Sequence, residues 1–120
     1  MTEQDIKRIW EKGIKIEGLD PDLYRKDVAG ALMIFTKFND HTDEYGWSID
    51  HIYPIAMGGD DNPVNLRPMH IENIRSKGSD FPVYFRVRKM DGTRNIIQRG
   101  QCRIGTKLLE TIKTLYGYNG

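Results

Sequence analysis

The 120-residue chain has one cysteine, no long apolar run and no repeated or low-complexity segment. The single thiol, Cys102, excludes an internal disulfide and any zinc site built on paired cysteines. No apolar stretch approaches the roughly 20 residues that a membrane-spanning helix needs, and the first residues lack the apolar segment of a signal peptide. We therefore expect a protein of a reducing compartment, the cytoplasm, without a membrane partner.

No Pro/Ser-rich linker divides the chain, so we expect one domain, residues 1–120, large enough for one modest core. Apolar periodicity and turn residues predict its elements. The predicted helices span residues 2–12, 28–38, 69–77 and 107–116, and the predicted strands span residues 47–52, 65–67, 83–90 and 93–98. Asp91-Gly92 is typical of a two-residue hairpin turn, which would place Val87 opposite Ile96.

Charge is unevenly distributed along the chain, although the net charge is only +1. Residues 1–66 carry −6 and residues 67–120 carry +7. The segment 84–107 is the most basic, with seven cations and one acid. Such asymmetry favours a polyanionic partner, whereas the alternative is a solvated outer face of the predicted hairpin.

An Asp-His pair, Asp50-His51, closes the predicted strand 47–52. A Gly58-Gly59 loop, Asn65 and a short helix with His70 near its start follow. This order predicts a carboxylate, an imidazole and amide groups around one small concavity. These are the groups needed to hold a hard divalent cation beside a general base.

The motifs resemble the HNH nuclease family over residues 45–80. They read Asp50-His51-Ile52-x-Pro54, Gly58-Gly59, Asn65-Leu66-x-Pro68-x-His70 and Arg75-x-Lys77. The resemblance implies an α+β fold with a ββα-metal core. An N-terminal helical segment would precede this core, and a C-terminal β-hairpin plus helix would follow it.

The resemblance also implies roles for individual residues. His51 would be the general base that activates water, and Asn65 would fix the loop and orient His51. Asp50 would bind one divalent metal ion, magnesium or manganese. The implied reaction is hydrolysis of a DNA phosphodiester bond that leaves a 5′-phosphate and a 3′-hydroxyl, with double-stranded DNA as the expected partner.

The chain departs from the family at its second metal-binding position, nine residues after the loop asparagine, which is occupied by Ile74. An aliphatic side chain cannot bind a metal ion. On a helix, His70, Asn73 and Ile74 share a stripe. We therefore hypothesise that His70 or Asn73 faces the Asp50 carboxylate as a substitute ligand.

Ile74 also favours an alternative function, a catalytically weakened HNH-like module that binds nucleic acid or a protein partner. Arginine binds phosphate bidentately, so the basic residues near the motif and in the hairpin are candidate phosphate contacts. These nucleic-acid-binding candidates are Arg67, Arg75, Lys77, Arg86, Arg88 and Arg94. By contrast, His41, Asp60 and Asp61 are interpreted as exposed loop residues, and Trp10, Trp47 and Phe35 as core.

Overall fold

The computed structural model describes residues 1–120 and has an α+β fold, as predicted, with three α-helices and three two-stranded antiparallel sheets. The helices are α1 (Glu3–Trp10), α2 (Ile71–Lys77) and α3 (Thr106–Tyr116). The strands are β1 (Tyr24–Lys26), β2 (Leu32–Ile34), β3 (Trp47–His51), β4 (Leu66–His70), β5 (Val83–Asp91) and β6 (Arg94–Arg103). None of the helices has the length and apolar character required to cross a membrane.

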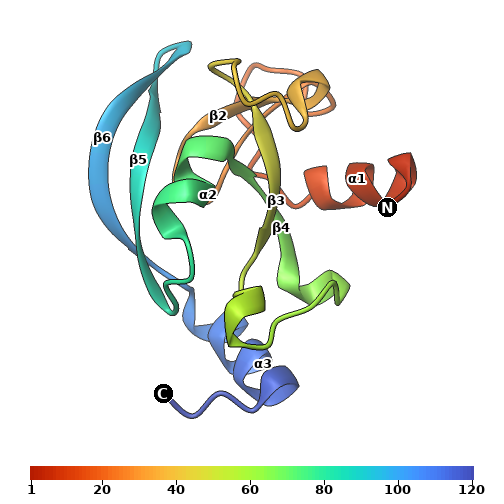
Figure 1. The fold of residues 1–120 in the computed structure, drawn as a ribbon. Coiled ribbons are helices and arrows are strands. Elements are labelled where there is room, and N and C mark those ends of the chain that lie inside the picture. The colour runs from red at the N-terminus through yellow and green to blue at the C-terminus, as the bar shows by residue number, and fades with distance from the viewer.

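The β3–β4 hairpin lies at the centre of the molecule, and α2 begins directly after β4. Figure 1 shows α2 between this hairpin and the β5–β6 hairpin, with α3 near the loop that joins β3 to β4. In the β3–β4 register, Asp50 lies opposite Arg67 and Trp47 lies opposite His70. The strand end that carries Asp50 and His51 is therefore also the end at which the long connection begins.

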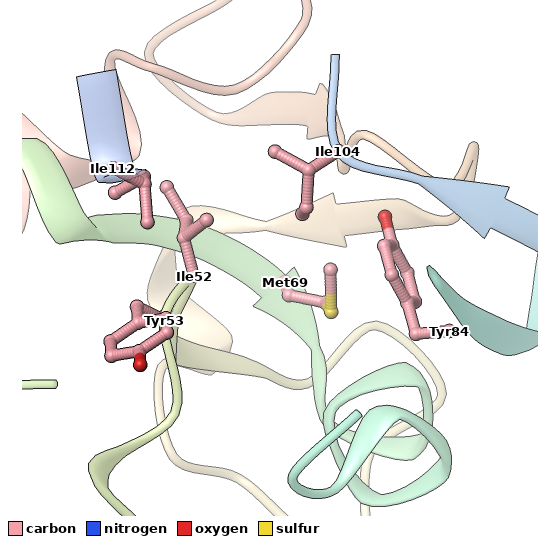
Figure 2. Close-up of a cluster of buried hydrophobic side chains, with 6 residues drawn as sticks. All are labelled: Ile52, Tyr53, Met69, Tyr84, Ile104 and Ile112. Carbon is pink, nitrogen blue, oxygen red and sulfur yellow. The ribbon is translucent and has the colours of Figure 1, made fainter. Parts of the chain in front are cut away.

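Two apolar clusters hold these elements together. Figure 2 shows the larger one, in which Met69 of β4 and Tyr84 of β5 lie near Ile104 and Ile112 from the C-terminal part of the chain. The smaller cluster contains the predicted core aromatics Trp10 and Trp47, with Phe35 against them. Both tryptophans are buried, which confirms that they are not an exposed stacking platform.

Helix α1 follows its sequence signature closely. The Thr2 hydroxyl accepts from the Asp5 amide, and the Asp5 carboxylate accepts from the Thr2 amide. This reciprocal pair is a capping box, which satisfies two otherwise unpaired amides at the helix start. Ile9 and Trp10 form its buried face.

The predicted helix over residues 28–38 is wrong. This segment contains β2 and a short 3₁₀ turn, Phe35–Lys37. Just before β2, the Asp27 carboxylate accepts from the Ala31 amide across a tight turn. The Asn95 side chain bonds both the amide and the carbonyl of Leu32, and these contacts from a distant strand outweigh the local helical pattern.

The boundary between β4 and α2 also differs from the prediction. The strand runs to His70 and includes Pro68, so the helix begins at Ile71 and not at Met69. Pro68 is tolerated because β4 pairs with one neighbour only, and an edge strand has amides that need no ladder partner. His70 caps the helix by accepting from the Glu72 amide.

The β5–β6 hairpin exists as predicted but in another register. Asp91 pairs with Arg94, so Gly92 and Thr93 form the turn, and Lys89 rather than Val87 lies opposite Ile96. A bulge interrupts pairing between Arg86 and Arg88. In α3, Ile112 is fully buried, whereas Leu115 is 42% exposed.

Candidate active site

Asp50 lies at the end of β3 and is ion-paired on both carboxylate oxygens. Its Oδ2 accepts from Arg67 Nε at 2.8 Å, and its Oδ1 lies 3.3 Å from Lys77 Nζ. Asp50 is only 4% exposed, and both cations are buried with it. Paired cations compensate for the desolvation of a buried carboxylate, so the three residues form one buried cluster with a net positive charge.

Lys77 connects the end of α2 to the end of β3. Besides its contact with Asp50, its ammonium donates to the His51 carbonyl at 2.9 Å. Burial lowers the pKa of Lys77, and the Asp50 carboxylate acts in the opposite direction. Lys77 thus holds the Asp50 side chain and the His51 backbone. The sequence predicted a phosphate contact for this ammonium, which is buried within the protein.

Arg67 is likewise occupied within the protein. Its guanidinium lies 5.5 Å from the centre of the Tyr84 ring, a distance typical of a cation–π contact. Its Nη2 is buried without a hydrogen-bond partner.

The His51 imidazole is paired with an acid that sequence analysis interpreted as a solvated turn residue. Its Nε2 lies 2.8 Å from Asp61 Oδ1. The His51 side chain is 23% exposed and that of Asp61 is 75% exposed. The imidazole is therefore accessible to water while one of its nitrogens contacts a carboxylate.

Asn65 makes the side-chain-to-backbone hydrogen bonds predicted for it. Its Oδ1 accepts from the Tyr53 amide at 2.7 Å, and its Nδ2 donates to the carbonyls of Tyr53 and Asp60 at 3.1 and 3.0 Å. Asn65 is completely buried. It therefore ties together both sides of the connection that follows His51.

The two glycines of this connection serve different needs. Gly58 has a φ of 107°, a conformation that other residues adopt only with strain. At Gly59 a Cβ atom would lie 1.9 Å from the Tyr53 carbonyl oxygen, so no side chain fits. The Gly-Gly motif thus permits a close approach of two backbone segments beside His51.

A cavity of about 230 Å³ lies between β3, the end of α2 and the turn Ile55–Met57. Ile49, Asp50 and His51 all line it, but Asp50 is only 4% exposed and its carboxylate contacts Arg67 and Lys77. Ile74 also lines this cavity, which places the aliphatic side chain where the family resemblance implies a metal ligand. Ser79 and Gly78 complete its wall after α2.

The structure does not bring His70 to the Asp50 carboxylate. His70 lies opposite Trp47, at the other end of the hairpin from the Asp50–Arg67 pair. Its Nε2 contacts the Glu44 carbonyl at 2.7 Å and its Nδ1 accepts from the Glu72 amide at 3.1 Å. A carbonyl only accepts, so Nε2 carries the proton and neither nitrogen has a free lone pair for a metal ion.

Asn73 is also directed elsewhere. Its Nδ2 donates to the Asp27 carboxylate and to the Arg88 carbonyl, and its Oδ1 accepts from the amides of Val87 and Arg88. These four bonds use its normal hydrogen-bonding capacity. They satisfy the amides at the bulge in β5, next to the interrupted pairing between Arg86 and Arg88.

The remaining predicted phosphate contacts also have partners within the chain. Arg88 pairs with Glu72, Arg94 with Glu44, and Arg75 donates to His41. The Arg86 guanidinium donates to the carbonyls of Gln98 and Ala29. The exposed cations Arg99, Arg103 and Lys107 have no such hydrogen bond or ion pair.

Two contacts beside the site are not indicated by the sequence. Asp61 contacts His51, and Tyr116 of α3 donates to Asp60 Oδ1 at 2.5 Å. Tyr116 lies 65 positions beyond His51, and nothing local in the sequence indicates that α3 reaches this loop. The sequence predicted the loop after His51, but not its contact with α3.

Comparison of the chain with protein-family models, with curated proteins and with solved structures gives no match. The geometry also contains no cluster of three or more His, Cys, Asp or Glu side chains placed to hold a metal ion.

Proposed function

We propose that this chain is an HNH-type phosphodiesterase that hydrolyses nucleic acid, with DNA as the expected substrate. The observation that carries this proposal is the cavity lined by both Asp50 and His51. The His51 imidazole is partly exposed and can act on a phosphodiester bound in this cavity, and Asp50 precedes it on the strand. The order β3, β4, α2 agrees with the ββα core that the family resemblance implies.

His51 has the environment of a general base. It is partly exposed, contacts a carboxylate and is held at its carbonyl by Lys77. A neutral imidazole with a free nitrogen can accept the proton of an attacking water. Asn65 supports this function indirectly, because it fixes the backbone that follows His51.

The cavity fits a divalent ion that the protein shares with its substrate, but not one that the protein holds alone. Asp50 is the only acidic residue lining it, Ile74 offers no donor atom, and two cations already contact Asp50. Magnesium is commonly bound by one or two carboxylates together with substrate phosphates and water. When bound, such an ion would stabilise the negative charge of the scissile phosphate.

A second candidate function is an HNH-like module that binds nucleic acid without cleaving it. Ile74 in the cavity wall and the ion-paired state of Asp50 favour this alternative. Both features weaken a metal site, and neither prevents binding of a phosphate backbone by exposed cations.

Nicking of supercoiled plasmid distinguishes the two functions. The protein is incubated with plasmid and magnesium or manganese, alongside a chelator control and His51→Ala. The matched control is His41→Ala, since His41 lies in an exposed loop away from the cavity. Metal-dependent nicking that is lost only in His51→Ala supports the enzyme. A gel shift without nicking supports the binding module, and neither nicking nor binding contradicts both.

A further inference from the structure

We propose that Asp61 is a positioning residue for His51, and that Tyr116 of α3 holds the loop that carries Asp61. This inference rests on the proposed function, because it concerns the same general base. It extends that function to a residue and a helix outside the motifs that suggested it.

The first step concerns the tautomer of His51. An ionised carboxylate only accepts hydrogen bonds, so in the neutral imidazole the proton must lie on Nε2, which contacts Asp61 Oδ1. This leaves Nδ1 with a free lone pair. A carboxylate partner also fixes the orientation of the ring, as acidic partners of metal-bound histidines do.

The second step concerns how an exposed acid is kept in place. The neighbouring Asp60 is held twice: its carboxylate accepts from the Tyr116 hydroxyl at 2.5 Å, and its carbonyl accepts from Asn65 Nδ2 at 3.0 Å. The Tyr116 hydroxyl lowers the pKa of the Asp60 carboxyl, as expected for a bond to its ionised form. Asp61 therefore follows an anchored residue.

The loop is anchored on its other side by Lys12, two residues after α1. The Lys12 ammonium donates to the carbonyls of Pro63 and Leu66. The Tyr116 ring is itself fixed by stacking on Tyr53, with centroids 4.9 Å apart and planes 16° apart. Elements from both ends of the chain thus restrain the loop beside His51.

The first test measures the His51 tautomer directly by nitrogen NMR of the imidazole ring in the full chain, without substrate. We expect the wild-type protein to hold the proton on Nε2, and Asp61→Asn to populate both tautomers. Asp22→Asn, a change to another exposed turn acid, is the matched control. An unchanged tautomer in Asp61→Asn would overturn the proposal.

The second test measures cleavage kinetics. We expect Asp61→Asn to lower kcat about 10- to 100-fold, the range found for residues that orient a functional side chain, with little change in KM. Asp61→Glu should restore part of the rate. Tyr116→Phe should lower kcat several-fold, whereas Tyr118→Phe, which alters a neighbouring tyrosine, should not. Thermal melting of each variant verifies that it is folded.

The outcomes separate this inference from the proposed function. An increase in kcat for Asp61→Asn would mean that Asp61 shields the imidazole, and would overturn the positioning role. If the wild-type protein cleaves nothing, the proposed function fails, but the NMR comparison still tests the Asp61–His51 pair. If Asp61→Asn alters the His51 tautomer but no protein cleaves nucleic acid, the Asp61–His51 contact orients the imidazole without a catalytic function.

Discussion

Asp50 and Ile74 together determine how tightly the chain by itself can bind a divalent ion. Arg67 and Lys77 neutralise the carboxylate, and position 74 adds no oxygen or nitrogen donor. Loss of an oriented ligand partner typically lowers metal affinity about 10- to 100-fold. We therefore expect weak binding of manganese to the free protein and tighter binding when nucleic acid is present.

Ile74→Asn tests this account at the residue scale. The amide oxygen would face the cavity that Asp50 lines, so manganese affinity of the nucleic-acid-free protein should rise about ten-fold or more. The measurement is a manganese titration followed by electron paramagnetic resonance. Ile74→Val, which keeps the site apolar, should bind no better than the wild type. No gain in Ile74→Asn would show that position 74 does not face the ion.

At the scale of elements, the connection between β3 and β4 depends on two adjacent glycines with different physical reasons. Gly59 allows the Tyr53 carbonyl to approach, while Gly58 supplies a positive φ in open space. Steric overlap with a backbone atom can be relieved only by moving the loop, whereas a positive φ is strained but accessible.

We therefore expect alanine substitutions at the two glycines to lower the stability of the protein by unequal amounts. Gly59→Ala should destabilise the protein by about 2 kcal/mol or more, and Gly58→Ala by about 1 kcal/mol. Urea unfolding measures both. Because the loop carries Asp61, Gly59→Ala should also disturb the His51 tautomer. Equal losses of stability in the two variants would contradict the close approach at Gly59.

The β5–β6 hairpin gives a second prediction at this scale. Arg86 and Arg88 are occupied within the chain, whereas Arg99 and Arg103 are exposed without partners. Arg103 pairs with Val83, four residues beyond Ser79 in the cavity wall. If the chain binds DNA, the free cations should contact its phosphates.

We expect the double substitution Arg99→Gln and Arg103→Gln to reduce the salt dependence of DNA binding by about two phosphate contacts. Arg86→Gln with Arg88→Gln is the matched control and should leave the slope unchanged while lowering stability. The slope of the logarithm of affinity against the logarithm of salt concentration is the measurement. If the slope falls in Arg86→Gln with Arg88→Gln and not in Arg99→Gln with Arg103→Gln, then Arg86 and Arg88 contact the phosphates, as the sequence predicted.

For the whole molecule, ionisation of the buried Tyr84 side chain makes the stability of the fold depend on pH in the alkaline range. It is 1% exposed within the larger apolar cluster (Figure 2), and burial raises its pKa to about 12. Between pH 10 and about 12 the unfolded chain loses this proton before the folded chain does. Rising pH therefore favours the unfolded state, and the stability contribution is lost across that window.

Tyr84→Phe should remove this dependence. The free energy of unfolding of the wild type should fall by about 1 to 2 kcal/mol more than that of the variant between pH 10 and 12, allowing for solvent screening. Urea unfolding at several pH values measures the difference. Tyr24→Phe is the control, and parallel pH profiles for wild type and Tyr84→Phe would contradict the argument.

Local pattern predicted those parts of the fold that depend on neighbouring residues. The helix predicted over residues 2–12 and the strand predicted over residues 47–52 required no distant partner. The pattern failed over residues 28–38, where the apolar spacing suits a helix but the Asn95 side chain bonds the Leu32 backbone. It also failed at the hairpin register, because Gly92 and Thr93 form the turn in place of Asp91-Gly92.

The sequence by itself determined that an acid and a histidine end a strand before a glycine-containing loop, since these features depend on residue order and short-range periodicity. Only the tertiary structure decided which groups surround them. Arg67 and Lys77 neutralise Asp50, Asp61 contacts His51, and His70 and Asn73 turn elsewhere. These contacts join residues 10 to 46 positions apart, and local pattern carries no information about which distant side chain a folded backbone brings within hydrogen-bonding distance.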